Sequence, residues 1–285
     1  MSSLHRKPVA TRTLLFLILV IAALYFVLPV YWLIISSTKN IPDLFGTFGF
    51  WIAERNFLIH NLERLFARDG GVYILWIFNT ILIAGSAALI GSVTCALAGY
   101  AFAKFEFPGK KIVFNTIFAG LFIPLTALAL PIFLLMRDLG WINTYQSVIL
   151  PIAANPFGVY FMTAYARGAV PIELIESARI EGANELQIFL RVIARLISPG
   201  LATLFLITFV LSWNNFFLPL IVLNQRSMYP ITVGLQNWSR LSEAGREVLY
   251  DVVITGSAVS IIPLMVIFLF LQRYWTKGLT VGAVK

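Results

Sequence analysis

The sequence contains little charge. Asp, Glu, Lys and Arg make up only 12% of its 285 residues, whereas 59% of the residues are hydrophobic. A soluble core of this size does not need so much apolar surface. The formal charge of +8 comes from basic residues that stand singly at the ends of apolar segments, as membrane topology requires. The sequence therefore predicts an integral membrane protein in contact with lipid, with no nucleic-acid partner.

Cysteine and histidine are almost absent. The one cysteine, Cys95, excludes a disulfide within the chain, and His5 and His60 are too few and too far apart for a local metal cluster. A phosphate-binding GxxxxGK[ST] loop is also missing, because the segment 109–111 (GKK) lacks the first glycine and the hydroxyl residue. We therefore expect no catalytic residue, no metal site and no cofactor in this chain, and an energy source that binds to another protein.

Six apolar segments contain no Asp, Glu, Lys, Arg or His. Each can cross a hydrocarbon core of about 30 Å as a helix that rises about 1.5 Å per residue. They predict an all-α integral membrane protein with six transmembrane helices in a single domain, residues 1–285. The six predicted spans are 14–35, 72–103, 112–136, 146–166, 196–224 and 252–271.

Three segments carry further structural signals. In 112–136, Pro124 and Pro131 each remove a backbone hydrogen bond and should kink the helix. Residues 56–67 have the period of an amphipathic helix at the membrane surface. A small-residue face in 72–103 predicts close packing against another helix, although glycine and alanine are also common in membrane helices generally. That face consists of Gly85, Ala88, Gly91, Ser92, Cys95, Ala96 and Gly99.

The distribution of basic residues sets the predicted orientation. Six spans place both termini on one side of the membrane, and 13 of the 21 Lys and Arg residues lie in the segments on that side. Segments rich in Lys and Arg stay in the cytoplasm. Both termini and the segment 171–195 are therefore predicted to be cytoplasmic.

The segment 171–199 (PIELIESARIEGANELQIFLRVIARLISP) is the longest amphipathic stretch between two spans. Pro171 suits the first turn of a helix, and Glu176 follows where the helix dipole favours negative charge. Gly182 interrupts the pattern about three turns later, which indicates a turn or a close backbone approach. Apolar residues then recur at helical spacing. The pattern predicts helix, glycine turn, helix, outside the hydrocarbon; the second helix is marked by Leu186, Phe189, Leu190 and Ile193.

These residues resemble a known motif. Glu176-Ser177-Ala178, followed by Gly182 and an apolar run, is similar to the "EAA…G" cytoplasmic loop of ATP-binding-cassette (ABC) importer permeases. The segments SWNNFFLPL, YPITVGL and QRYWTKGLTVGAVK resemble the carbohydrate-importer, maltose-type branch of that family. Ser177 replaces the middle alanine of the motif, and Arg195 stands where the family usually has proline.

The resemblance implies a multi-pass permease of the prokaryotic plasma membrane that imports a sugar or oligosaccharide. The implied partners are a second, similar permease, two ATPase subunits that hold ATP and Mg²⁺, and an extracytoplasmic solute-binding protein. Within 171–195, it implies that Glu176 pairs with the ATPase and that Leu186 and Phe189 brace the second helix against the permease body. A solvated charge is the alternative for Glu176. The implied ATPase-coupling residues are Glu176, Ser177, Ala178, Gly182, Leu186 and Phe189.

The substrate path is expected to use neutral polar and aromatic groups within the spans, because a sugar offers hydroxyls and flat apolar faces. The same asparagines equally suit hydrogen bonds that hold helices together. The resemblance further places contact with the binding protein at Tyr229, Pro230 and Gly234. The candidates for the path are Asn79, Asn115, Asn155, Trp213, Asn214 and Asn215.

The sequence disfavours two other classes of membrane transport protein. An ion-coupled secondary sugar carrier usually places ionisable groups at mid-membrane, and none of the six spans contains one. A channel subunit needs rings of carbonyls or charges, for which the sequence offers no candidate. The ABC importer permease is therefore the favoured prediction, with the secondary carrier as its alternative.

Overall fold

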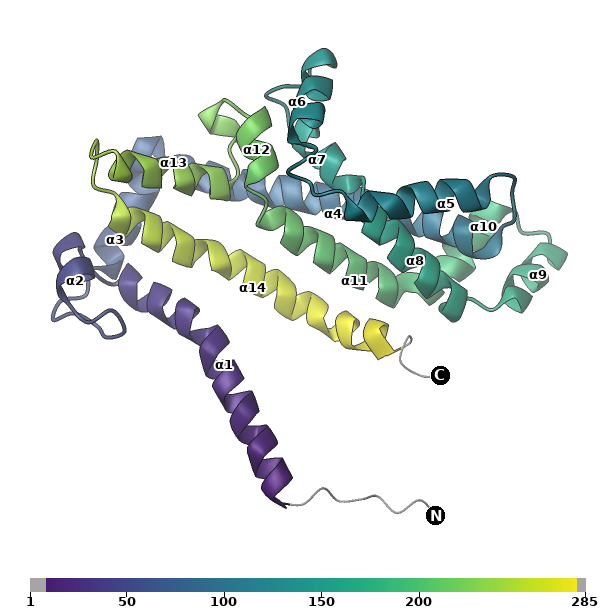
Figure 1. Cartoon of the computed structure of the whole chain (residues 1–285), viewed down its shortest axis with the longest axis horizontal. Coiled ribbons are helices and arrows are strands. Elements are labelled where there is room, and N and C mark those ends of the chain that lie inside the picture. The colour runs from purple at the N-terminus through teal and green to yellow at the C-terminus, as the bar shows by residue number, and fades with distance from the viewer. Residues whose placement is uncertain (1–8, 281–285) are drawn as a thin grey trace. The chain divides into compact units, whose positions relative to one another are not determined.

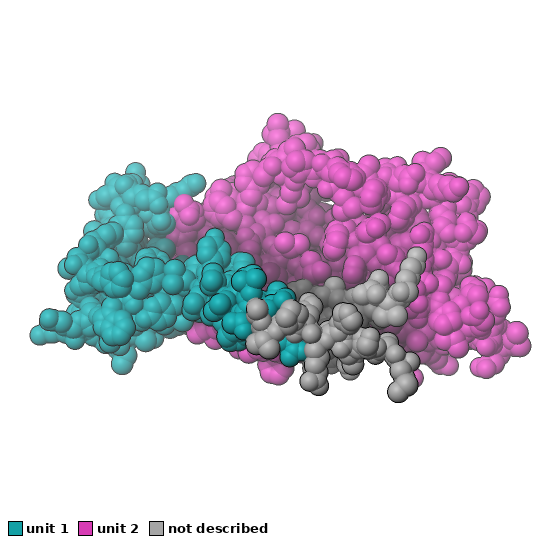
Figure 2. Space-filling model, turned by 60° about the horizontal axis from the view of Figure 1, so that its bottom comes forward, with its two compact units in different colours: residues 1–71, 237–261 teal, residues 72–236, 262–285 magenta. Residues whose placement is uncertain are grey.

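The computed structural model describes residues 9–280, and the chain packs into two compact units. The single permease domain expected for 1–285 stays a prediction. Unit 1 consists of residues 1–71 and 237–261, and unit 2 consists of residues 72–236 and 262–285 (Figure 2). The predicted cytoplasmic placement of both chain ends concerns residues that lie partly outside the described range.

The described residues form helices and no strands (Figure 1). This confirms the predicted all-α class. The α-helices are α1 (Val9–Ser37), α2 (Ile41–Gly46), α3 (Leu58–Ala67), α4 (Val72–Lys104), α5 (Lys110–Ala119), α6 (Ala129–Asp138), α7 (Gln146–Ala153), α8 (Pro156–Ala169), α9 (Ile172–Ile180), α10 (Glu185–Ile188), α11 (Ala194–Trp213), α12 (Phe217–Val222), α13 (Ile231–Glu243) and α14 (Tyr250–Thr280). The shorter elements are η1 (Arg68–Gly70), η2 (Gly120–Phe122), η3 (Phe189–Ile193) and η4 (Arg226–Met228).

Five helical segments in the described residues are long and apolar enough to cross a membrane. Four of them match the first, second, fourth and sixth predicted spans. The remaining segment, Glu185–Trp213, overlaps the fifth predicted span. The helix of the second span, α4, has 33 residues. It is therefore about 50 Å long and exceeds the hydrocarbon thickness, as its uncharged length predicted. The five segments are Thr11–Ser37, Val72–Lys104, Gln146–Ala169, Glu185–Trp213 and Tyr250–Phe270.

The third predicted span is broken rather than kinked. The segment 112–136 divides into α5 with η2 and, after a non-helical stretch at 123–128, α6. Ile123 is extended, with φ −91° and ψ 115°, as a residue before proline prefers to be. Pro131 lies in the first turn of α6, where its missing N–H removes no helical hydrogen bond. Pro124 therefore accounts for the break, and Pro131 is compatible with the helix that contains it.

The fifth predicted span is displaced toward the N-terminus. The helix that carries it starts at Glu185 and ends at Trp213, and a separate short helix, α12, covers most of 214–224. Asn215 lies two residues before α12, and its side chain accepts a hydrogen bond from the Leu218 N–H in the first turn at 3.2 Å. The residues expected at the outer end of this span therefore form a second, separate helix.

The packed core of unit 2 forms around α4, which lies against α7, α8 and α11. The predicted small-residue face makes these contacts. A Cβ on Gly99 would come within 2.6 Å of the Met162 Cβ, and one on Gly91 within 3.1 Å of the Ala153 carbonyl oxygen. Gly85 is the exception, since nothing lies within 4 Å of its Cβ position. Close backbone approach through small residues therefore builds this unit.

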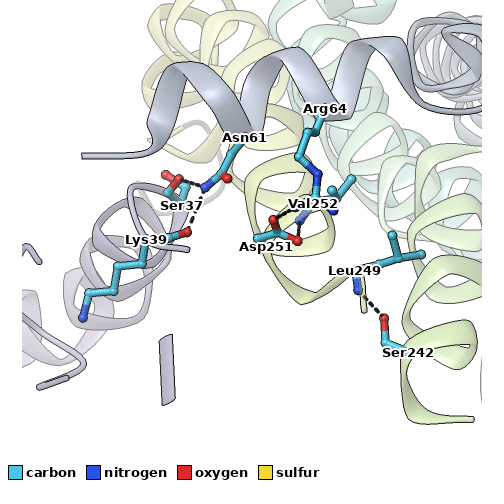
Figure 3. A network of polar contacts seen from close by, with 8 residues as sticks. All are labelled: Ser37, Lys39, Asn61, Arg64, Ser242, Leu249, Asp251 and Val252. Atoms are coloured by element: carbon cyan, nitrogen blue, oxygen red, sulfur yellow. Dashed lines mark hydrogen bonds and ion pairs between the residues drawn. The ribbon is translucent and has the colours of Figure 1, made fainter. Parts of the chain in front are cut away.

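Unit 1 contains the predicted surface helix as α3, which begins at Leu58 instead of Asn56. A polar network holds it (Figure 3). The Asn61 amide is buried and donates to the carbonyl oxygens of Ser37 and Lys39, both at 2.9 Å. One turn later, Arg64 forms an ion pair with Asp251, which is only 2% exposed. These contacts fix α3 to the end of α1 and the start of α14.

Candidate ATPase-coupling site and transport path

The predicted helix–turn–helix is present as α9, a turn at 181–184, and α10. Gly182 has φ +82°, a left-handed conformation that glycine adopts without steric cost. The Gly182 N–H donates to the Arg179 carbonyl, and the Ala183 N–H reaches back to the Ala178 carbonyl, both at 3.0 Å. This pair of hydrogen bonds is the Schellman arrangement that ends helices. No atom lies within 4 Å of a Cβ built on Gly182, so the glycine serves the turn and not a close approach.

The helix after the turn starts with a complete capping box. The Asn184 side chain accepts from the Gln187 N–H at 2.9 Å, and the Gln187 side chain accepts from the Asn184 N–H at 3.0 Å. Such reciprocal bonds satisfy N–H groups that the first turn leaves free. Together with the Schellman arrangement, they give the turn one defined backbone path.

The inner face of the loop packs on unit 2. Ile175 is 1% exposed and Ile188 is fully buried, and both belong to the core cluster that α4, α8 and α11 also supply. Ala178 and Phe189 pack against the same cluster, and the Phe189 ring lies 5.7 Å from the ring of Tyr100 on α4. The inner face of the loop is therefore packed against α4, α8 and α11.

The outer face of the loop is exposed and partly apolar. Glu176 and Ser177 are exposed, as expected for contact residues. Ile180 is 88% exposed and Leu186 is 65% exposed, so the loop presents two large apolar side chains on this face. The expectation that Leu186 braces the second helix against the permease body is wrong, because Leu186 points away from the core. Phe189 packs against the core as predicted, and Ile188 provides the packing that was expected of Leu186.

An ion pair reinforces the turn. Arg179, before the glycine, contacts Glu185, after it, at 2.8 Å, and its guanidinium lies 5.9 Å from the ring centroid of Phe105. Phe105 follows α4, so this contact links the coupling loop to the α4–α5 connection. The motif did not indicate Arg179 or Ile180, although an isoleucine between charged residues before Gly182 was a usable signal.

The second coupling helix runs without interruption into the membrane. From Glu185 to Trp213 the chain is helical throughout, with one π-helical turn, η3, at the junction. Single π turns inside α-helices occur frequently at functional sites. Arg195, which replaces the usual proline of the family, is an exposed residue of α11, and the helix passes through it unbroken. The second helix of the loop and α11 are therefore one continuous helical segment.

Two asparagine candidates for the substrate path, Asn79 and Asn155, form hydrogen bonds within the fold. Asn79 is fully buried; its amide donates to the carbonyls of Ser227 at 2.8 Å and Tyr229 at 3.0 Å, and it accepts from the Tyr145 hydroxyl at 2.8 Å. Asn155 caps α8 by accepting from the Gly158 N–H at 3.1 Å. The Asn155 amide also donates to the Thr208 hydroxyl of α11 at 3.3 Å. Both residues therefore match the alternative in which asparagines hold helices together.

The remaining candidates lie in two environments. Trp213 is 3% exposed and packs on the Phe209 ring at 5.6 Å, inside the α4–α11 cluster. Asn215 caps α12. Asn115 and Asn214 are exposed, and the Asn214 amide donates to the Val210 carbonyl at 2.9 Å. Of the six candidates, Asn115 and Asn214 are the most exposed, whereas Asn155 and Asn215 are half-buried.

Two of the three residues predicted to contact the binding protein are buried. Pro230 is buried, and a Cβ on Gly234 would come within 2.2 Å of the Trp76 ring. Tyr229 is half-buried, and its hydroxyl donates to the Asn224 carbonyl at 3.4 Å. The exposed surface of this region lies just before them, at 224–227.

The chain resembles known transport proteins over nearly its whole length. It is 34% identical over 275 residues to the arabinooligosaccharides transport system permease protein AraQ of Bacillus subtilis (strain 168), covering 96% of each protein. It is 30% identical to the lactose transport system permease protein LacG of Rhizobium radiobacter, covering 94% of each. Its fold matches a chain from the crystal structure of a bacterial ABC transporter involved in the import of the acidic polysaccharide alginate. That match has a TM-score of 0.81 and 22% identity, and covers 96% of this chain and 100% of the other.

A family match agrees with these likenesses. Residues 91–281, which include the coupling loop and α11, match the family described as "Binding-protein-dependent transport system inner membrane component". The proteins of this family are transporter permeases and not catalytic subunits. From this match, and from the similarity over nearly the full length, the chain belongs to the family of inner-membrane permease components of binding-protein-dependent ABC transport systems.

Proposed function

We propose that this chain is one of two permease subunits of an ATP-driven sugar importer, and that its α9–α10 loop docks on a separate ATPase subunit. The observation that carries the proposal is the loop itself. It exposes Ile180 and Leu186 on one face, packs Ile188 into the core on the other, and continues as one helix into the membrane.

This geometry suits the transmission of force. Apolar side chains that protrude from an aqueous surface gain free energy when a partner covers them. A buried inner face resists relative sliding, so movement of a docked ATPase carries the loop and α11 together. Alternating access generally proceeds by rigid-body movements of this kind. In this scheme Glu176 pairs with a basic group of the ATPase, and ATP and Mg²⁺ bind to the ATPase.

The proposed substrate is a neutral sugar or oligosaccharide. Two relatives named for arabinooligosaccharide and lactose transport support the class. The absence of ionisable side chains from the six predicted spans supports a neutral solute, because a charged one would favour counter-charges along its path.

A second permease completes the path in this proposal. Asn115 and Asn214 lie at the surface of unit 2 and not within an enclosed cavity. A partner surface that faces them would supply the other wall and the remaining hydrogen bonds to sugar hydroxyls. The extracytoplasmic binding protein would contact the exposed residues 224–227 and the neighbouring Tyr229.

The excess of Lys and Arg in the segments assigned to the inner side supports an orientation with the α9–α10 loop and both termini in the cytoplasm of a prokaryotic cell. In this orientation the loop faces the compartment that contains ATP.

The decisive experiment is co-purification followed by an ATPase assay. The tagged chain, solubilised in mild detergent, should retain a second permease and an ATPase. Reconstituted in liposomes, the complex should hydrolyse ATP faster when sugar-loaded binding protein is added, and should take up radiolabelled sugar only with ATP inside the compartment that holds the ATPase. A chain that purifies alone and transports sugar in response to a proton gradient would refute the proposal and favour the secondary carrier.

A further inference from the structure

A cleft of about 560 Å³ opens at the end of unit 2 that carries the coupling loop. Its walls come from the α4–α5 connection, the first turn of α5 and the last turn of α8. Since α8 leads through 170–171 directly into α9, the cleft lies on the same side of the membrane helices as the coupling loop.

The cleft carries an excess of positive charge. Three basic residues line it, Lys110, Lys111 and Arg167, together with one acid, Glu106. Lys110 is committed to this acid, because its ammonium contacts the Glu106 carboxylate and the Phe105 carbonyl, each at 2.7 Å. The pKa of Glu106 is held below its ordinary value, chiefly by the hydrogen bond and charge of Lys110 and also by Lys111 and Arg167.

Two charges therefore remain available. Lys111 and Arg167 are exposed, and among the described residues neither forms an ion pair. Both line the same cleft as the Glu106 carboxylate. Such an arrangement has room and charge for an anionic group between them.

Next to these cations, the first turn of α5 exposes apolar side chains. Ile112, which lines the cleft, is 74% exposed, and Val113 is 47% exposed. Farther along α5, the Phe118 ring lies 5.3 Å from the ring of Tyr160 on α8, so aromatic side chains meet along the α5–α8 seam. A soluble anion would have no use for this surface, whereas an acyl chain would cover it.

We propose that this cleft binds the headgroup of an anionic phospholipid, with the phosphate between Lys111 and Arg167 and an acyl chain along the α5–α8 seam. Basic pockets between membrane helices on the cytoplasmic side bind such headgroups. The site goes beyond the proposed transport function, because lipid binding requires neither the sugar nor the ATPase. It places a lipid beside Phe105, which Arg179 of the coupling loop contacts.

Lipid binding to the full-length chain, purified in mild detergent with the proteins it retains, tests the proposal. Native mass spectrometry would measure the affinity for phosphatidylglycerol and for zwitterionic phosphatidylcholine. The double variant Lys111→Gln/Arg167→Gln should bind phosphatidylglycerol roughly 30-fold more weakly, since each basic residue near an anionic lipid surface contributes about fivefold. Phosphatidylcholine binding should change little.

Two further variants separate charge from folding. Lys111→Arg/Arg167→Lys keeps both charges and should keep phosphatidylglycerol binding. Arg191→Gln/Arg195→Gln removes two exposed charges outside the cleft and should also leave phosphatidylglycerol binding unchanged. Elution volume and melting temperature would verify that each variant folds.

Three outcomes would overturn the proposal. In the first, the double glutamine variant binds phosphatidylglycerol as tightly as the wild type. In the second, inorganic phosphate at constant ionic strength displaces the lipid at concentrations comparable to the lipid's own affinity, which would identify a site for free phosphate. In the third, the double variant keeps the lipid and loses the ATPase, which would identify a protein interface. Loss of transport with unchanged lipid binding would bear on the importer proposal alone.

Discussion

Substitution of Gly182 should weaken coupling through the backbone alone. Its φ of +82° is left-handed, and no atom lies within 4 Å of the position of a Cβ. An L-residue in that conformation costs about 1–2 kcal/mol relative to its preferred geometry. Alanine also lowers the conformational entropy of the chain when the turn is not formed, and this effect offsets about 0.4–1 kcal/mol of that cost. The net penalty for Gly182→Ala is therefore about 1 kcal/mol, or roughly fivefold in the population of the docking-competent turn.

The side chain decides how far this penalty grows. Asparagine adopts the left-handed conformation more readily than other L-residues, so Gly182→Asn should stay near wild type. A β-branched residue at positive φ is a genuine outlier, so Gly182→Val should cost more than alanine. The predicted order of ATPase affinity is Gly, Asn, Ala, Val.

The assay is titration of the purified ATPase into the permease pair held in lipid nanodiscs, with ATP-driven uptake in liposomes as the second readout. Gly140→Ala is the matched control, because Gly140 also has positive φ, +68°, and open space around its Cβ position, but lies in the connection between α6 and α7. It should leave ATPase affinity unchanged. The reasoning is refuted if Gly182→Val binds the ATPase as tightly as the wild type, or if the control loses as much.

Two further substitutions test the packing of each unit. Gly234→Ala would bring its Cβ within 2.2 Å of the Trp76 ring and should lower the stability by about 1–3 kcal/mol, measured in a thermal-shift assay. Gly168→Ala, whose Cβ meets no atom within 4 Å, should not lower the stability. Equal melting temperatures for the two variants would contradict this packing. Arg64→Ala would leave the carboxylate of Asp251 buried without its counter-charge and should destabilise unit 1 by about 3 kcal/mol, measured as increased proteolysis of residues 1–71; unchanged proteolysis would show that the ion pair contributes little.

Local chemistry explains why the coupling loop was predictable. Pro171 begins a helix, Gly182 ends it, and hydrophobic spacing resumes after the turn. Each of these signals acts within a few residues, so the structure reproduces them as a Schellman arrangement followed by a capping box. The sequence left open whether Gly182 serves a turn or a close backbone approach, because only its φ angle and its neighbouring atoms distinguish the two roles.

The predicted spans likewise differ in how far the sequence alone determined them. Uncharged length alone predicted α1, α4 and α14, since a helix must hydrogen-bond its own backbone within lipid. The third span was harder, because a proline breaks, kinks or simply starts a helix according to its position relative to the helix start. Pro124 interrupts the chain whereas Pro131 lies in a first turn.

The direction in which side chains point was decided only by tertiary structure. Leu186 and Phe189 share a hydrophobic pattern, yet Leu186 is 65% exposed and Phe189 packs on the core. Asn79 and Asn115 are equally polar, yet one is buried in three hydrogen bonds and the other is exposed. By itself, the sequence determined the all-helical membrane class, the position of the coupling loop and its glycine turn, because these depend on composition and local spacing. Which faces of those helices meet the core, and which remain for a partner, depends on contacts between residues far apart in the chain.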